Sequence, residues 1–288
     1  MQTLIIILAI VALIIILFPI VLHRVYRAPR LVENITPESL DLRYAQYEIP
    51  TLKDKKLYAW LIKASQSNVT VIIAHGWGAN AQMMLPLAVP FQQAGMEVML
   101  YDARTHGKSD SDTFSSLPRF AEDLVSVIRW VRKKRAKQSI IVLGHSLGAA
   151  AAMLAASWRA EIDIVIGVSG FAHPRLVMLR HLDRSWLPSF LVPVIIRYVQ
   201  WVIGYRFDDI APMNRIRFIS CPVLLAHGTE DQVVPISDMH LIVRNAGLDA
   251  DIRIIEIEGA KHNSVRQFQE HADLLIEFIR AKLGDAHV

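Results

Sequence analysis

The sequence contains one cysteine, Cys221, among its 288 residues. A lone cysteine cannot form an internal disulfide, so a disulfide-stabilised scaffold is excluded, and a chain of this length can bury a stable core without one. No cluster of cysteines and histidines has the spacing of zinc ligands, so we expect neither a metal nor a cofactor. The length fits one large domain with room for an insertion.

Neither sign of charge predominates, because the formal net charge is only +4. The densest basic run, Arg129–Lys137, lies at the end of a predicted helix, where cations complement the helix dipole. Contact with anionic lipid headgroups is the alternative interpretation of this run. No nucleic-acid-binding motif accompanies the charge, so we expect no nucleic acid partner, and the pattern indicates no particular oligomeric state.

Charged residues are missing entirely from Leu4 to Leu22, an apolar run that only Pro19 interrupts. Such a run is long enough to cross a bilayer, so we predict a single-pass transmembrane anchor over residues 1–23. A cleaved signal peptide and a buried core helix are the alternatives, but no Lys or Arg precedes the run and no small-residue cleavage site follows it. Basic residues follow at once, so the positive-inside rule predicts a catalytic domain on the cytoplasmic side; they are His23, Arg24, Arg27 and Arg30.

The rest of the chain predicts an α/β fold. After a linker over residues 24–41, residues 42–63 suit an antiparallel hairpin. Continuous apolar runs then alternate with helical patterns, which predicts a mostly parallel sheet flanked by helices. The predicted strands are Val69–Ala74, Glu97–Tyr101, Ser139–Leu143, Ile162–Val168, Pro222–Ala226 and Asp251–Glu258, and the predicted helices are Asn80–Ala94, Leu117–Lys134, Leu147–Trp158 and Val265–Leu283. We assign residues 42–170 and 214–288 to the core, and the apolar helical stretch 171–213 to an insertion above the sheet.

The strongest chemical signal is the pentapeptide Gly144–Gly148, which reads G-H-S-L-G. It follows an apolar strand and opens an alanine-rich helix, which is the context of a nucleophile elbow, the strained turn that exposes a catalytic serine. A chance G-x-S-x-G turn is the alternative, and the flanking strand and helix argue against it. We therefore predict Ser146 as the nucleophile, and a serine at this position excludes a dehalogenase, which needs an aspartate.

A serine nucleophile needs a base, and the base needs an orienting carboxylate. Asp231 and His262 each follow one of the last two predicted strands. Because ligands bind at the carboxyl ends of parallel strands, both side chains are expected on the edge that carries Ser146. We predict Asp231 as the acid and His262 as the base, with Glu230 as the alternative acid. Taken singly, each is equally typical of a surface loop.

The developing oxyanion needs backbone N–H donors that are in place before the reaction. One candidate is the amide of Leu147, directly after the nucleophile. The other is the amide of Trp77, in the glycine-containing loop His75–Gly78 that follows the first parallel strand. A simple glycine turn is the alternative interpretation of this loop.

Five segments together resemble the α/β-hydrolase superfamily: HGWG (75–78), DARTHGKS (102–109), GHSLG (144–148), HGTEDQVVP (227–235) and GAKH (259–262). They are most similar to its monoglyceride-lipase-like and serine-aminopeptidase-like (S33-type) branches, over residues 42–283. The resemblance implies the α/β-hydrolase fold, the triad Ser146, Asp231 and His262, and the oxyanion donors Trp77 and Leu147. The chain departs from the pattern at Thr105, where many relatives have glycine. The resemblance also implies structural roles for four other histidines, His75, His106, His145 and His227.

In relatives, an insertion at the place of residues 171–213 forms a helical lid over the nucleophile. The resemblance therefore makes four apolar residues of this stretch candidates for substrate binding: Leu176, Leu179, Trp186 and Phe190. At helical spacing, such residues are also typical of ordinary core packing.

The residues and the resemblance together predict a membrane-anchored serine hydrolase that forms an acyl-enzyme. The expected activity is carboxylic-ester hydrolysis of esterase or lipase type, on an acyl lipid or another hydrophobic ester. A serine peptidase or amidase of the same fold is the first alternative. A non-catalytic, membrane-bound binding protein is the second, and the intact triad argues against it.

Overall fold

The computed structural model describes residues 1–2, 13, 16–17, 19–21, 23–24, 27–32, 34–65, 67–182 and 188–284. The predicted transmembrane run from Leu4 to Leu22 therefore lies largely outside the described residues. Within the described part of the chain, no helix is both long and apolar enough to cross a membrane.

Eight strands form one mixed sheet in the order β1-β2-β4-β3-β5-β6-β7-β8. β1 and β2 form the predicted antiparallel hairpin, β2 pairs antiparallel with β4, and all later neighbours are parallel. The strands are β1 (Tyr44–Thr51), β2 (Lys55–Ile62), β3 (Val69–Ala74), β4 (Glu97–Tyr101), β5 (Ser139–His145), β6 (Ile164–Val168), β7 (Val223–Gly228) and β8 (Ile252–Ile257). The prediction of a mostly parallel sheet flanked by helices is confirmed.

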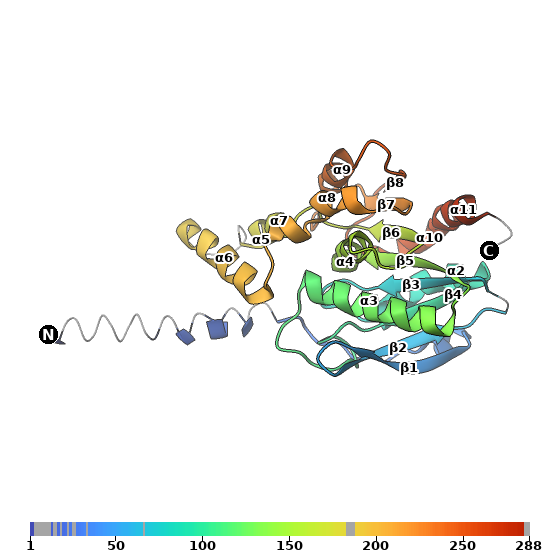
Figure 1. Cartoon of the computed structure of the whole chain (residues 1–288), viewed down its shortest axis with the longest axis horizontal. Coiled ribbons are helices and arrows are strands. Elements are labelled where there is room, and N and C mark those ends of the chain that lie inside the picture. Colours follow the sequence, from blue (N-terminus) through green and yellow to red (C-terminus); the bar gives the residue numbers. More distant parts are fainter. Residues whose placement is uncertain are drawn as a thin grey trace.

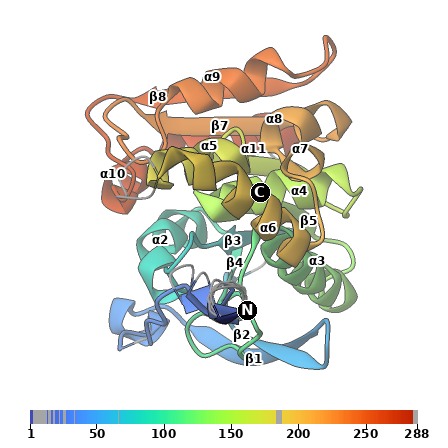
Figure 2. The same cartoon turned by 90° about the vertical axis from the view of Figure 1, so that its left-hand side faces the viewer.

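The helices cover both faces of this sheet. The α-helices are α2 (Leu85–Gln93), α3 (Leu117–Lys134), α4 (Leu147–Ser157), α5 (Pro174–Leu182), α6 (Val192–Ile203), α7 (Phe207–Ile210), α8 (Pro212–Arg215), α9 (Ser237–Arg244), α10 (Val265–Glu270) and α11 (Ala272–Leu283), and the 3-10 helices are η1 (Pro37–Leu40), η2 (Gln82–Met84), η3 (Ser189–Leu191) and η4 (Ile216–Phe218). In Figure 2, α2 and α10 lie on one side of the sheet, and α3 and α4 on the other.

The central strands are apolar on both faces because both faces are covered. In β3, the side chain of Ile72 joins the cluster under α3 and α4, while Val71 and Ile73 join the cluster under α2, α10 and α11. All six residues of β3 and every residue of α4 are buried. The alanines of α4 let it pack closely against the strands, which fixes the position of the residue that precedes this helix.

The structure differs from the helical predictions after β7 and near the C-terminus. The predicted helix Val265–Leu283 is two helices, α10 and α11, which meet at His271, where φ is −107° and ψ is 17°. The break lets Phe268 of α10 and Phe278 of α11 both face the sheet, each 2% exposed or less. Helix α9 was not predicted at all, because it is short and polar on its outer side.

Between β6 and β7, the described residues contain helices and no strand. Figure 1 shows α5 and α6 standing off the left-hand end of the sheet. At the base of this insertion, Arg180 of α5 forms an ion pair with Asp238 of α9, whose carboxylate is fully buried and also accepts the Ala172 amide at 3.0 Å.

The backbone conformation at Thr105 explains why many relatives have glycine at this position. Its φ is 73°, in the left-handed region that a β-branched residue rarely adopts. Its hydroxyl is also buried and finds no hydrogen-bond partner among the described residues. The turn after β4 therefore stores backbone strain of about 1–3 kcal/mol.

We predict that Thr105→Gly stabilises the fold. Relief of the left-handed strain outweighs the extra conformational freedom that glycine gives the unfolded chain, so the free energy of unfolding should rise by about 1 kcal/mol. For a chain of this size the melting temperature rises by roughly 2–4 °C. Thr105→Ala, which removes the hydroxyl but keeps a Cβ in the left-handed region, should recover only part of this gain in a denaturation experiment. A destabilised glycine variant would show that packing of the threonine outweighs the strain.

Candidate active site

Ser146 sits at the sharp turn between β5 and α4. Its φ is 53° and its ψ is −113°, and its amide donates to the carbonyl of Val168 at 2.8 Å. The two glycines of the motif are required by close backbone contacts. A Cβ on Gly148 would lie 2.2 Å from the carbonyl oxygen of Ala74, and one on Gly144 would lie 2.2 Å from that of Gly148. The turn can therefore form only where both side chains are missing.

The three residues predicted as a triad lie in one hydrogen-bonded chain. The hydroxyl of Ser146 is 3.0 Å from Nε2 of His262, and Nδ1 of His262 is 2.7 Å from Oδ2 of Asp231. Because Asp231 is acceptor-only when ionised, Nδ1 carries the proton and Nε2 is free to accept from the serine. This is the arrangement that transfers a proton from an attacking serine.

Asp231 is held as a buried carboxylate. Burial opposes its ionisation, but hydrogen bonds from His227, His262 and the Val234 amide together hold its pKa well below the usual range. Its Oδ1 accepts the amides of Val233 at 3.0 Å and Val234 at 2.8 Å. The carboxylate is thereby fixed in orientation as well as charge. Glu230, the alternative acid, is an exposed residue.

Contact between two loops brings together Asp231 and His262, the predicted acid and base. A Cβ on Gly228, at the end of β7, would lie 2.2 Å from the carbonyl oxygen of Ala260 in the loop after β8. Glu230 also donates its amide to Ala260 at 3.0 Å. From the nucleophile side, Nε2 of His145 donates to the carbonyl of His262 at 2.8 Å. The sequence pattern does not predict this positioning by Gly228, although a glycine three residues before the predicted acid is a usable signal.

The proposed oxyanion donors lie beside the nucleophile. A Cβ on Gly76 would lie 3.2 Å from Cβ of Ser146, so the His75–Gly78 turn passes directly over the elbow. The next amide, that of Trp77, donates no hydrogen bond to any residue that the structure describes. The amide of Leu147 opens α4, where the first N–H groups of a helix have no partner within it. Both amides are thus available to an anion at Ser146.

Three buried histidines tie the surrounding loops together. Burial lowers the pKa of His75 to about 4, of His106 to about 3 and of His145 to about 4, so all three imidazoles are neutral near pH 7. A neutral ring can donate from one nitrogen and accept at the other. His75 accepts the Ala103 amide at 2.9 Å, and His106 accepts the Gly78 amide at 3.1 Å.

The candidate substrate-binding residues of the insertion are dispersed. Leu176 and Leu179 are half-buried and pack against the core, whereas Phe190 is 74% exposed. Trp186 lies outside the described residues.

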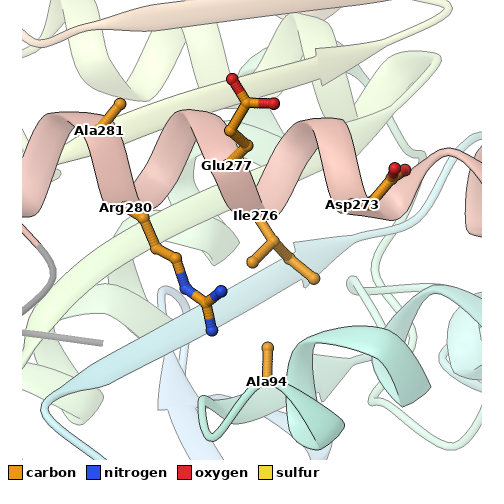
Figure 3. A pocket seen from close by; sticks show the side chains of 6 residues that line it. All are labelled: Ala94, Asp273, Ile276, Glu277, Arg280 and Ala281. Atoms are coloured by element: carbon orange, nitrogen blue, oxygen red, sulfur yellow. The ribbon is translucent and has the colours of Figure 1, made fainter.

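One surface hollow lies away from this chemistry. It is formed where α11 faces the end of α2 and is lined by Ala94, Asp273, Ile276, Glu277, Arg280 and Ala281 (Figure 3). Ile276 and Arg280 point toward Ala94, while Glu277 points away from it. The lining contains no serine, cysteine or histidine, so it offers no counterpart to the Ser146 site.

Comparisons with known proteins show which family this chain is similar to. The family model for serine aminopeptidase, S33, matches residues 65–217. The chain is 28% identical over 196 residues to the uncharacterised protein YqkD of Bacillus subtilis, a match that spans 66% of this chain and 64% of YqkD, less than two thirds of that relative's length. It is 24% identical over 232 residues to a monoglyceride lipase homolog of monkeypox virus, with 69% of this chain and 83% of the viral protein covered. An esterase structure from Pyrococcus furiosus superposes with a TM-score of 0.74 at 25% identity, covering 90% of this chain and 98% of the esterase.

We predict that Gly228→Ala disables the site while the fold survives. The new Cβ must push the Asp231 loop away from the His262 loop, and a misplacement of about 1 Å can cost roughly 100-fold in rate. The turnover number should fall by about that factor in a steady-state assay, with the circular dichroism spectrum unchanged. Gly247→Ala is the matched control, because a Cβ there meets nothing within 4 Å. Equal activity of the two variants would contradict the role given to Gly228.

Proposed function

The chain belongs to the serine aminopeptidase S33 family and is a serine hydrolase with the α/β-hydrolase fold, and from this premise we propose that it hydrolyses carboxylic esters of hydrophobic acids at a membrane. The observation that carries this proposal is the hydrogen-bonded chain from Ser146 through His262 to Asp231. Each of the three groups has the partner that acyl transfer requires, and two backbone amides next to the serine are free.

In the proposed first step, Oγ of Ser146 attacks the ester carbonyl carbon while its proton passes to Nε2 of His262. Asp231 stabilises the imidazolium that forms. The bond to the leaving alcohol then breaks, and the imidazolium returns the proton to the alcohol oxygen. In the second step, His262 removes a proton from water, which attacks the acyl-serine and releases the acid, so that Ser146 recovers its proton.

The tetrahedral intermediates carry a negative oxygen, which the amides of Trp77 and Leu147 are proposed to bind. Loss of one such donor typically costs about 2.7–4 kcal/mol of transition-state stabilisation. These donors are fixed before the substrate arrives, because the glycine contacts around Ser146 leave the turn little freedom.

The N-terminal run supports a hydrophobic substrate. We propose that Leu4 to Leu22 anchor the protein in a bilayer. Seven residue steps lead from Leu22 to Pro29, whose ring contacts Gly78 beside Trp77. A chain of that length spans at most about 25 Å, so the anchor would end close to the active-site rim.

Exposed aromatic residues of the insertion support the same proposal. Phe190 of η3 is 74% exposed and Trp201 of α6 is 76% exposed. Tryptophan side chains such as that of Trp201 favour the interface between lipid and water. We propose that the insertion forms a lid over Ser146 and that Leu176 and Leu179 contribute to the acyl site.

Amide hydrolysis by the same residues is the second candidate function. The family description, a serine aminopeptidase, favours it. The chemistry at Ser146 would be identical, with His262 protonating an amine in place of an alcohol.

We predict that the full-length protein in detergent micelles cleaves p-nitrophenyl esters and monoacylglycerols, with kcat/KM rising from short to long acyl chains. A fluorophosphonate probe should label the same protein. Ser146→Ala should abolish labelling and lower kcat by roughly 10⁶-fold, as loss of a triad nucleophile does. Ser237→Ala, which removes an exposed serine on α9, should change neither.

Other results would redirect the proposal. Preference for aminoacyl p-nitroanilides over esters would favour the peptidase function. Activity confined to short, soluble esters would contradict the lipid substrate, and no labelling at all would favour a non-catalytic binding protein.

We also propose that the catalytic domain faces the cytoplasm, since basic residues directly follow the apolar run. A reporter fused after residue 288 and active only in the cytoplasm should therefore be functional, whereas one active only outside the cytoplasm should be silent. Moving the positive charge, by replacing Arg24 and Arg27 with glutamine and adding lysines before Leu4, should raise the fraction of inverted protein. An active external reporter on the unaltered chain would contradict this orientation.

A further inference from the structure

The segment that leads into the domain lies along the proposed oxyanion turn. Residues 27–32 and 34, here called the entry segment, run beside the loop that begins at Gly76 and ends at Gln82. The ring of Pro29 packs on Gly78 so closely that a Cβ there would lie 2.9 Å from its Cγ. The carbonyl of Leu31 accepts the side-chain amide of Asn80 at 3.2 Å, and Gln82 accepts the amide of Asn34 at 2.6 Å. The contacts therefore follow the loop for most of its length.

Arg30 of the entry segment holds a second loop, the turn after β4. Its Nε donates to the carbonyl of Gly107 at 2.8 Å and its Nη1 to the hydroxyl of Ser111 at 2.7 Å. Its Nη2 donates to the carbonyl of Ser109. One planar guanidinium thus satisfies three acceptors of the same turn, which a lysine cannot do because it lacks the fork of donors.

The turn after β4, which Arg30 holds, also contacts the loop from Gly76 to Gln82, and this contact is made by His106. Nδ1 of His106 donates to the carbonyl of Arg104 at 3.1 Å, which leaves Nε2 to accept the amide of Gly78 at 3.1 Å. The peptide unit that joins Trp77 to Gly78 is therefore fixed at its N–H end. Burial and the nearby Arg30 charge both lower the pKa of His106, so the ring stays neutral and keeps this acceptor.

We propose that Arg30 is a positioning residue for ester hydrolysis: with Pro29, it braces the loop from Gly76 to Gln82 so that the Trp77 amide points at the oxyanion. This inference rests on the proposed role of that amide at Ser146. It makes the linker between the apolar run and the domain a working part of the active site, although the family match begins only downstream of it.

The brace predicts a defined kinetic signature. A displaced donor weakens binding of the transition state and leaves binding of the neutral ester unchanged, so kcat falls while KM does not. In the full chain, Arg30→Ala should lower kcat about tenfold, a fraction of the 10²–10³ lost when a whole donor is removed. The affinity for a boronic acid, which mimics the tetrahedral intermediate, should weaken by a similar factor.

Matched variants separate this role from a loss of folded protein. Arg27→Ala is the control, because Arg27 is exposed and makes none of the contacts of Arg30; it should leave kcat and boronate affinity unchanged. Arg30→Lys should recover only part of the activity. All rates are expressed per site titrated with a fluorophosphonate, so unfolded molecules do not count.

The outcomes are distinguishable. If the unaltered protein neither labels nor turns over esters, the proposed function is wrong and the brace with it. If it is active and Arg30→Ala has the same kcat per titrated site and the same boronate affinity, only the brace is wrong. A rise in KM at constant kcat would likewise overturn it, because it would place Arg30 in substrate binding.

Discussion

The hydrogen bond from Ser146 to His262 is the interaction on which the arrangement of the site depends, and the sheet alone does not secure it. β5 and β8 are separated in the sheet by β6 and β7. His262 must therefore reach back across two strands from a loop. It does so because its backbone carbonyl is held by His145 at 2.8 Å and its ring by Asp231 at 2.7 Å. With both ends of the residue fixed, the imidazole has one orientation, and that orientation faces the serine.

Burial determines how the imidazole rings near the site are oriented, because it requires them to form hydrogen bonds. An unpaired buried donor or acceptor costs about 1–3 kcal/mol, so each neutral imidazole in the interior must find partners for both nitrogens or leave the interior. His75 and His106 meet this requirement by binding backbone groups of the turns at the carboxyl end of the sheet. The same bonds that make their burial tolerable therefore fix the backbone next to the nucleophile. A charged histidine could not accept an amide, so the low pKa values and the loop geometry have one cause.

The sequence was enough to place the residues that come directly after a strand. Ser146, Asp231 and His262 were predicted from periodicity and motif because the carboxyl ends of parallel strands share an edge, and the structure brings these side chains within hydrogen-bonding distance. It was not enough for contacts between segments without a common element. Arg30 and Gly107 are 77 residues apart, and neither carries a pattern that indicates the other. The break between α10 and α11 was missed for a related reason, since no glycine or proline marks it and only packing on the sheet produces it.

The division of the site into two halves has a physical consequence for how it can be regulated. Ser146, His262 and Asp231 follow β5, β8 and β7, and their positions depend on the buried core. The turn with Trp77 follows β3, and its outer side is covered by the entry segment, in which Pro29 and Arg30 are exposed residues. Local opening of an exposed segment requires far less free energy than unfolding of a core strand. A displacement of the entry segment would therefore reach the turn with Trp77 first and leave the hydrogen bonds among Ser146, His262 and Asp231 intact, so this half of the site is the one most open to control from outside the core.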